Sequence, residues 1–160
     1  MIKLPLTLIL TLGLGCTLYA EQVFNDPLSD SIQISAAGMR TQNERLKVIT
    51  QNIANENITA LTEKDDPYRR KVIYFENKFD KDLNTETLAV KKINKDYSPF
   101  KLRYEPTHPA ADKDGMVKYP NINLVIETVD AKEAQRSFEA NLYALDISKS
   151  NLNKIIDLMK

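Results

Sequence analysis

The sequence has few of the residues on which enzymatic and metal chemistry depends. It contains no tryptophan, one histidine and one cysteine in 160 residues. A lone histidine cannot complete a His-rich metal site, and a lone cysteine cannot form a disulfide within the chain. Basic and acidic residues number 22 each, so the charge balance does not indicate a polyanionic partner such as nucleic acid.

Glycine is also scarce, because two of the four lie in the first twenty residues and the other two, Gly38 and Gly115, are isolated. This excludes a glycine-rich phosphate loop, and no nucleophile elbow is present. The acidic loop from Asp112 fails the EF-hand pattern, because Val117 and Asn123 occupy the glycine and closing glutamate positions. His108 is flanked by prolines and is interpreted as a structural loop residue. We therefore predict no catalytic residue, no metal site, no cofactor and no small-molecule substrate.

The first twenty residues have the order of a secretory signal peptide. Lys3 precedes an apolar run, Leu4 to Leu14, that is too short to span a bilayer, and small residues follow. We predict cleavage between Ala20 and Glu21, which would leave 21 basic and 22 acidic residues, a net charge of about −1, and no cysteine. In a rival reading, "LGLGC" is a lipoprotein box and Cys16 becomes the acylated N-terminus.

Proline divides the remaining chain into three parts. Five prolines lie between residues 67 and 120, whereas residues 28–66 and 121–160 have none. Because proline breaks helices, the two flanks can form long helices and the middle cannot. We predict an α+β fold, in which residues 21–61 form an N-terminal helical segment, 62–120 a central β-rich region and 121–160 a C-terminal helix.

Both flanks show a heptad spacing that predicts an antiparallel, coiled-coil-like helical hairpin. In the first flank the seam positions are Ile32, Ser35, Met39, Gln42, Leu46, Ile49 and Ile53, with Asp30 or Ser31 available as an N-cap. In the second they are Leu124, Ala131, Ala134, Phe138, Asn141, Leu145, Ser148, Leu152, Ile155 and Met159. These seams are unusually polar. Two interpretations remain open: a small monomer with a mediocre core, or helices that pack against further helices in an assembly.

The middle region is patterned as strands. The stretch "YRRKVIYFE" (68–76) alternates, and "LAVKKI" (88–93) and "FKLRYE" (100–105) are shorter candidates. The sequence "DKDG" (112–115), before "MVKY", predicts a tight turn in which Gly115 has a positive φ.

Four segments carry a resemblance to a known family. They are "ISAAGMRTQNERLKVITQNIANENIT" (34–59), "PYRRKVIYFE" (67–76), "PTHPAADKDGMVKYPNINLV" (106–125) and "EAQRSFEANLYALDISKSNLNKIIDL" (133–158). In this order and spacing, the chain from about Asp30 to Lys160 resembles the bacterial flagellar rod and hook proteins. The third segment narrows the resemblance to a single kind of rod subunit.

The resemblance implies a noncatalytic structural subunit of the proximal rod, the shaft that crosses the periplasm in the flagellar basal body. It implies self-association in a helical assembly and contacts with other rod proteins and with ring and export-gate components. The motif positions expected at subunit interfaces are Gly38, Gln42, Arg45, Asn52, Ile53, Ala54, Asn55, Thr59, Tyr68, Arg69, Pro109, Gly115, Tyr119, Pro120, Asn121, Phe138, Asn141 and Leu145.

The stretch "NIANENIT" (52–59) contains three asparagines, and we interpret them in two ways, as a helix end and as a subunit contact. An asparagine in the left-handed conformation at Asn55 or Asn57 would end the first helix. Asn52 and Asn55 lie on one helical face, and we expect their amides to contact a neighbouring subunit.

The predicted signal peptide departs from the family, whose rod subunits normally pass through the flagellar export channel. The chain is either secreted by the general pathway, which we favour, or translated from a later start near Val23. An alternative function is a secreted periplasmic binding or adaptor protein built on a rod-like helical hairpin. A cell-wall hydrolase that uses His108, Asp112 and Asp114 is a third.

Overall fold

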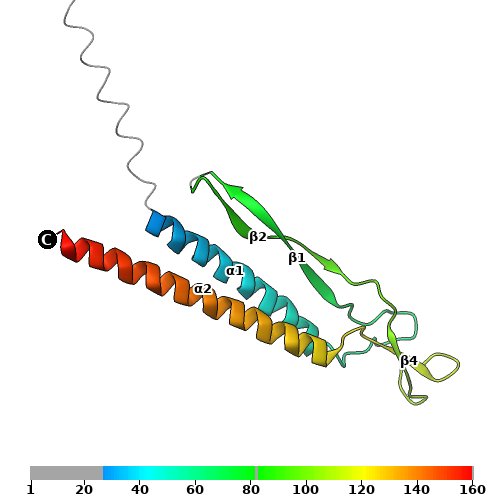
Figure 1. The fold of residues 1–160 in the computed structure, drawn as a ribbon. Helices are drawn as coiled ribbons and strands as arrows, with labels where there is room; N and C mark the ends of the chain where they lie inside the picture. The colour runs from blue at the N-terminus through cyan, green and yellow to red at the C-terminus, as the bar shows by residue number, and fades with distance from the viewer. Residues whose placement is uncertain (1–26, 82, 160) are drawn as a thin grey trace, which may run out of the picture.

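The computed structural model describes residues 27–81 and 83–159, and it consists of a long helical hairpin with a β-hairpin on one side and a small second sheet at one end (Figure 1). The predictions that fall on residues 1–26, namely the signal peptide, the Ala20/Glu21 cleavage, acylation of Cys16 and the Val23 start, lie outside the described residues. The elements in chain order are α1 (Pro27–Ala54), β1 (Lys71–Asp80), β2 (Thr85–Lys95), β3 (Lys101–Tyr104), β4 (Met116–Tyr119) and α2 (Leu124–Leu158). The α+β prediction is confirmed.

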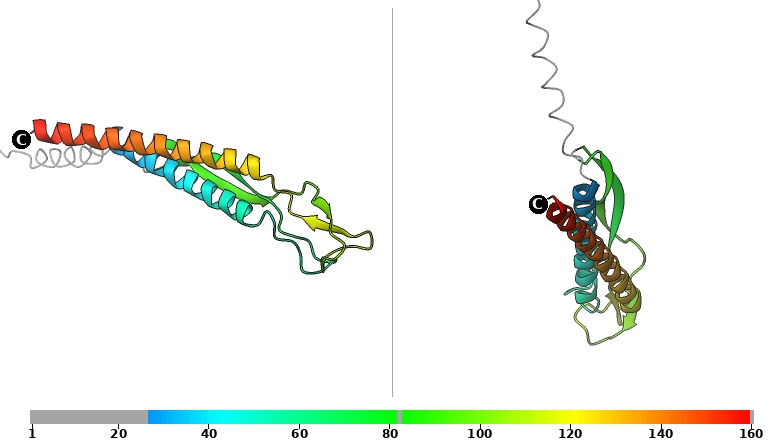
Figure 2. Two further views of the ribbon diagram at one scale, coloured as in Figure 1. Left: turned by 90° about the horizontal axis from the view of Figure 1, so that it is seen from below. Right: turned by 60° about the vertical axis from the view of Figure 1, so that its left-hand side comes forward.

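These elements stack in three layers, with α1 in the middle. Helix α2 packs along one side of α1 and the β1–β2 hairpin along another, while α2 has no backbone contact with either strand (Figure 2). The chain runs in opposite directions in the two helices, so the first described residues lie at the same end as the C-terminus (Figure 1). Beyond its first turns, where Arg70 contacts Glu127 and Asp130, α2 therefore packs against α1 alone among the described elements.

The ends of α1 differ from the prediction. The helix already begins at Pro27, so neither Asp30 nor Ser31 is its N-cap. Proline suits this position because its fixed φ is helical and its missing N–H would be unpaired there anyway. At the other end α1 stops at Ala54, as expected, but among the described non-glycine residues only Asn84 has a positive φ. The chain instead leaves through a tightened turn, in which the Asn55 N–H donates to Asn52 O at 3.1 Å.

Helix α2 begins at a cap that the heptad pattern did not indicate. The Asn123 side chain accepts hydrogen bonds from the N–H groups of Val125 and Ile126, at 3.0 and 3.5 Å. The predicted seams do face inward: Ser35, Gln42, Ile49, Ala134 and Ser148 are all buried. Three predicted seam positions of α2, namely Leu124, Ile155 and Met159, are instead exposed.

Strands β1 and β2 form an antiparallel hairpin whose register shifts at a bulge between Tyr74 and Phe75. The strand predicted over residues 68–76 is shifted in the structure: β1 starts at Lys71 and runs to Asp80. The hairpin lies against α1, where the Thr41 hydroxyl donates to Leu88 O at 2.9 Å.

The second sheet pairs β3 with β4 at the far end of the helical hairpin. Gly115 has φ of +76° in the connecting loop, which confirms the predicted turn. Asp112 closes this turn, because its side chain accepts from the N–H groups of Asp114 and Met116. Val117 and Ile122 are fully buried here and form a small core. Within the part of the chain that the structure describes, no helix is long and apolar enough to cross a membrane.

Candidate functional site

A buried polar junction joins the end of α1, the start of β1 and the first turns of α2. Its centre is Asn52, which is 0% exposed and uses its whole amide. The amide nitrogen donates to Lys71 O at 2.9 Å and to Glu127 Oε2 at 3.0 Å. The amide oxygen accepts from the Tyr68 hydroxyl at 3.0 Å and from the Lys71 N–H at 2.9 Å. One side chain therefore links three elements, and the expectation that the Asn52 amide contacts a neighbouring subunit is wrong.

Glu127 is the charged member of this junction and is also 0% exposed. Arg70 donates to it from Nε at 2.6 Å and contacts Asp130 at 3.6 Å and Asp96 at 3.8 Å. Arg45, on α1, reaches Asp130 at 3.8 Å. A buried carboxylate is tolerated only when it is paired and hydrogen-bonded, and Arg70 and Asn52 meet both needs.

The backbone around Arg70 is held by the predicted motif residue Asn121. Its side chain accepts from the Arg70 N–H at 2.9 Å and donates to Asp96 O at 3.0 Å and to Ser98 Oγ at 2.8 Å. The Ser98 N–H donates to the Asp96 carboxylate, which lowers the pKa of Asp96, and the positive charge of Arg70 acts in the same direction. Burial, together with the nearby Glu127 carboxylate, raises the pKa of Tyr68.

The loops next to β3 and β4 have their own set of side-chain contacts. His108 accepts from the Ala110 N–H at Nδ1, 3.0 Å away, and its Nε2 lies 3.1 Å from the Thr59 hydroxyl. Both ring nitrogens are thus engaged in tying the loop before β4 to the segment after α1. The Tyr119 hydroxyl donates to the Glu105 carboxylate at 3.0 Å, which raises the pKa of Tyr119.

Arg69 lies at the rim of the β3–β4 end, with its guanidinium 3.9 Å from the centre of the Phe100 ring. It also pairs with Asp66 at 3.3 Å. Burial favours the protonated form of Asp66, but the bonds from Lys118 and Arg69 outweigh it and lower the pKa of this carboxyl.

Gly38 on α1 lies directly against Asn141 on α2. A Cβ built there would lie 2.6 Å from Oδ1 of Asn141, so only glycine fits without displacing that side chain. Asn141 donates from Nδ2 to Ser137 O at 2.8 Å, which holds it in place. Both residues are motif positions, and the structure brings them together within one chain.

The remaining motif positions divide by exposure. Gln42 and Pro120 are buried, whereas Ile53, Asn55, Phe138 and Leu145 are half-buried and Ala54 and Pro109 are exposed. The Asn55 amide donates to Gln51 O at 2.7 Å. Many of the predicted interface positions thus have contacts within the subunit, and their role at subunit interfaces stays a prediction.

The sequence reasoning did not identify Glu127, Arg70, Asp96 and Asp130 as a network. One signal was available for Glu127, which lies seven residues before Ala134 and therefore occupies a seam position. Nothing local indicates Arg70, because its partner Glu127 lies 57 positions further along the chain.

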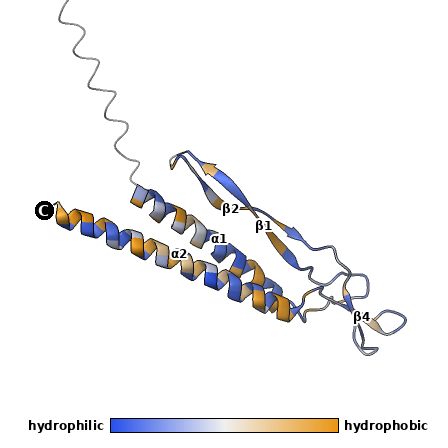
Figure 3. Cartoon of the chain, in the orientation of Figure 1, coloured by the Kyte–Doolittle hydropathy of each residue, from blue (hydrophilic) through white to orange (hydrophobic). Residues whose placement is uncertain are grey.

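The outward side of α2 is rich in exposed apolar side chains. Figure 3 shows hydrophobic colouring at both ends and in the middle of this helix. Val125, Val129, Tyr143 and Ile147 are 71, 61, 68 and 62% exposed. A helix with apolar residues on the side opposite its partner is typical of one that is buried on several sides.

Comparison with known proteins identifies the family. A family model described as "Flagellar basal body rod FlgEFG protein C-terminal" matches residues 113–158. The flagellar basal-body rod protein FlgC of Agrobacterium fabrum is 42% identical over 135 residues, which are 84% of this chain and 97% of the relative. The chain belongs to the FlgC family of flagellar basal-body rod proteins.

Two further FlgC relatives support the same family assignment. FlgC of Borreliella burgdorferi is 36% identical, over 83% of this chain and 98% of the relative. FlgC of Bacillus subtilis is 33% identical, over 81% and 97%. As a FlgC-family member, the chain is a structural subunit of the flagellar basal-body rod, and the family is one of rod proteins that assemble with other rod components, not one of enzymes.

Proposed function

We propose that this FlgC-family chain builds the proximal rod, the part of the shaft that crosses the periplasm. In this proposal its subunits associate with one another in a helical assembly, contact other rod proteins, and meet ring and export-gate components at the base. The exposed apolar side of α2 is the observation that carries the proposal, because α1 covers only one side of this helix. Burial of apolar area contributes about 25 cal/mol per Å² to an assembly, from which the entropic cost of association is subtracted.

The motif residues have two roles in this proposal. Residues of the junction and the helix crossing, such as Asn52, Gly38 and Asn141, set the shape of the subunit. Exposed motif residues, such as Ala54 and Pro109, contact neighbouring subunits directly. A rigid subunit shape matters for a shaft, because a small error in the angle between neighbours is repeated along its length.

Secretion by the general pathway, followed by cleavage between Ala20 and Glu21, is the export route that we propose. The order of charged, apolar and small residues in the first twenty positions supports it. N-terminal sequencing of the protein from cells tests the route: Glu21 is the expected first residue. An acylated Cys16, or a start near Val23, would contradict it.

The proposal assigns no catalytic role to the chain. Both ring nitrogens of His108 have structural partners, Ala110 in its own loop and Thr59 in the segment after α1, which supports this. Triple replacement of His108, Asp112 and Asp114 by alanine is expected to leave cell-wall hydrolysis by the cells unchanged.

The rod assignment is tested by placing a charge on the exposed side of α2. In cells whose own copy is replaced by Val129→Asp, we expect the protein to be missing from isolated basal bodies, because the carboxylate would be buried between subunits. Thr128→Asp, on the adjacent exposed position, is the matched control and should assemble more readily. Normal incorporation of Val129→Asp would count against the proposal.

A further inference from the structure

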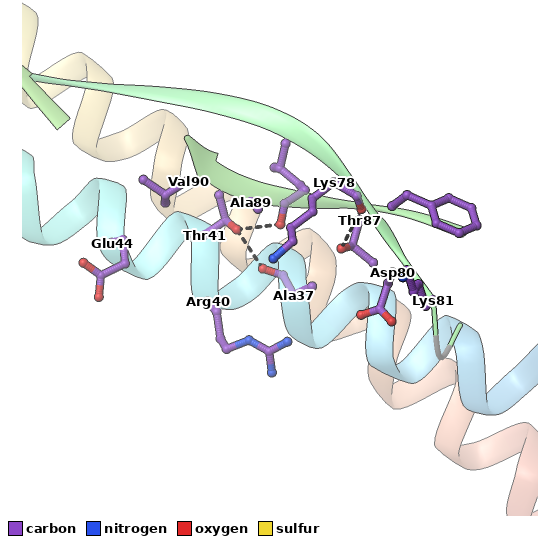
Figure 4. A pocket seen from close by; sticks show the side chains of 12 residues that line it. Ala37, Arg40, Thr41, Glu44, Lys78, Asp80, Lys81, Thr87, Ala89 and Val90 are labelled. Atoms are coloured by element: carbon purple, nitrogen blue, oxygen red, sulfur yellow. Dashed lines mark hydrogen bonds between the residues drawn. The ribbon is translucent and has the colours of Figure 1, made fainter. Parts of the chain in front are cut away.

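A groove separates α1 from the outer half of the β1–β2 hairpin. It has a volume of about 580 Å³ and is lined by Ala37 and Thr41 on the helix and by Leu88, Ala89 and Val90 on β2 (Figure 4). Thr41 fixes its depth, because its hydroxyl joins the helix to β2 at Leu88 O. The groove is therefore a shaped feature of the fold, with an apolar floor.

The rim of this groove carries an excess of positive charge. Arg40, Lys78 and Lys81 line it and have no acidic partner within the described part of the chain. Of the two acidic residues at the rim, Glu44 is paired with Lys47 at 3.7 Å and Asp80 accepts from the Leu83 N–H. An occupant with an apolar centre and flanking carboxylates would match both the floor and the rim.

Such a surface exists on α2 of the same protein. Ala140, Tyr143 and Ile147 follow one another at helical spacing on the side away from α1 and form an apolar ridge. Glu139 and Asp146 lie together along one side of this ridge, are exposed, and have no basic partner among residues 27–81 and 83–159. The ridge from Ala140 to Ile147 and the groove wall from Ala37 to Glu44 each span seven helical steps, roughly 10.5 Å.

We propose that the α2 ridge of one subunit docks in the α1–hairpin groove of a second copy of this chain. The inference rests on the proposed self-association and specifies its contact surfaces. A subunit cannot make this contact with itself, because α1 lies between its own α2 and its own hairpin. The two surfaces are different, so the contact is heterologous and can be repeated without closing into a dimer.

Cysteine crosslinking tests the contact directly. Cys16 is the only native cysteine, and it lies in the segment predicted to be cleaved. In full-length protein expressed in cells, we expect Lys78→Cys combined with Asp146→Cys to give disulfide-linked dimers and larger species on a non-reducing gel of isolated basal bodies. The control pair, Lys113→Cys with Asp146→Cys, places the first cysteine in the loop before β4 and should give no disulfide-linked species. Absence of crosslinks from the first pair, or equal crosslinking of both, would overturn the proposal.

Charge reversal provides a second, independent test. Lys78→Glu and Asp146→Lys should each lower the amount of protein in isolated basal bodies at least several-fold, and the double variant should restore it. A double variant no better than the single variants contradicts the docking. If Val129→Asp blocks incorporation while neither reversal has an effect, the rod function stands and the ridge–groove contact fails. If the unmodified chain is absent from basal bodies, the proposed function itself fails.

Discussion

Asn52 shows how much one buried polar side chain can determine in a small protein. The amide makes four hydrogen bonds, to Lys71 on β1, to Glu127 on α2 and to Tyr68 in the segment before β1, and the bond to Glu127 is fully buried. Removing one partner from a buried hydrogen-bond network costs the desolvation of the groups left behind. A mediocre helix former is thus used near the end of α1 because its amide can donate and accept at once.

We predict that Asn52→Ala lowers the free energy of unfolding by about 3 kcal/mol, since several buried groups lose their partner. Asn55→Ala is the matched control, because its amide bonds only Gln51 O and is half-exposed; its effect should stay below about 1 kcal/mol. Urea titration followed by circular dichroism measures both. Equal effects would show that the junction is not centred on Asn52.

Because the pKa of Tyr119 is raised, we predict that the stability of the protein depends on pH in the alkaline range. The pKa is raised because the phenol donates to Glu105 and is buried. A raised folded-state pKa means that the stabilisation is fully present below the unfolded value, about 10, and is lost as the pH rises through the folded value. Tyr119→Phe should therefore be less stable at neutral pH and lose less stability above pH ~10. Thermal melts from pH 7 to 11 test this, with the exposed Tyr97→Phe as the control. Parallel curves for all three proteins would contradict it.

The hydrogen-bond partners of individual buried side chains could not be predicted from the sequence. The polar seams and the oddity of Asn52 were visible in the sequence, but the partners were not. Tyr68 and Lys71 lie 16 and 19 positions after Asn52 and Glu127 lies 75 positions after it, and hydrogen bonds across such distances leave no periodic signal. The sequence alone therefore predicts a partner for the amide in a neighbouring subunit, whereas the fold satisfies the amide internally.

At the scale of elements, the helix crossing depends on a matched pair of residues. Gly38→Ala places a methyl group 2.6 Å from Oδ1 of Asn141, which must then give up its bond to Ser137 O. Alanine is favoured over glycine within a helix by about 1 kcal/mol, so the two effects oppose each other.

We predict that Gly38→Ala is neutral or destabilising in the native background but stabilising by about 1 kcal/mol when combined with Asn141→Ala, which removes the obstacle. A double-mutant cycle measured by urea unfolding gives the coupling between the two sites. Additive effects would mean that the helices do not meet at this point.

The Arg70–Glu127 pair is one of the contacts that attach the start of the β1–β2 hairpin to the helices. Arg70→Met should lower the free energy of unfolding by roughly 3–5 kcal/mol, because Glu127 would remain as a buried, unpaired charge. Adding Glu127→Met should recover part of this loss, since two apolar side chains leave no charge behind. Differential scanning calorimetry of the single and double variants tests the prediction, and a double variant less stable than Arg70→Met would contradict it.

Helices and strands were largely predictable, because their signals are local. Heptad spacing indicated the buried faces of α1 and α2, and strand and turn patterns indicated β1, β2, β3 and the Gly115 turn, whereas no strand was predicted at β4. Element ends were less predictable: α1 begins at Pro27, and β1 begins after Arg70, because Arg70 is drawn into the junction. The groove between α1 and the hairpin depends on how two elements pack, which no local pattern specifies.

At the scale of the whole molecule, the layer order explains why the chain suits an assembly. Helix α1 lies in the middle and is covered on two sides, while α2 and the hairpin each have one neighbour. The polar seams stabilise the pair less than an apolar seam would, and the outer side of α2 keeps its apolar residues exposed. Both features fit a FlgC-family rod subunit that completes its burial against neighbouring subunits.

Labelling of a single cysteine at position 129 tests this burial most directly. Val129→Cys is a small change at a site that is 61% exposed in the subunit. We predict that a water-soluble maleimide modifies this cysteine rapidly in the purified monomer and at least tenfold more slowly in isolated basal bodies. Equal rates in the two states would contradict the central claim that α2 is buried by its neighbours in the rod.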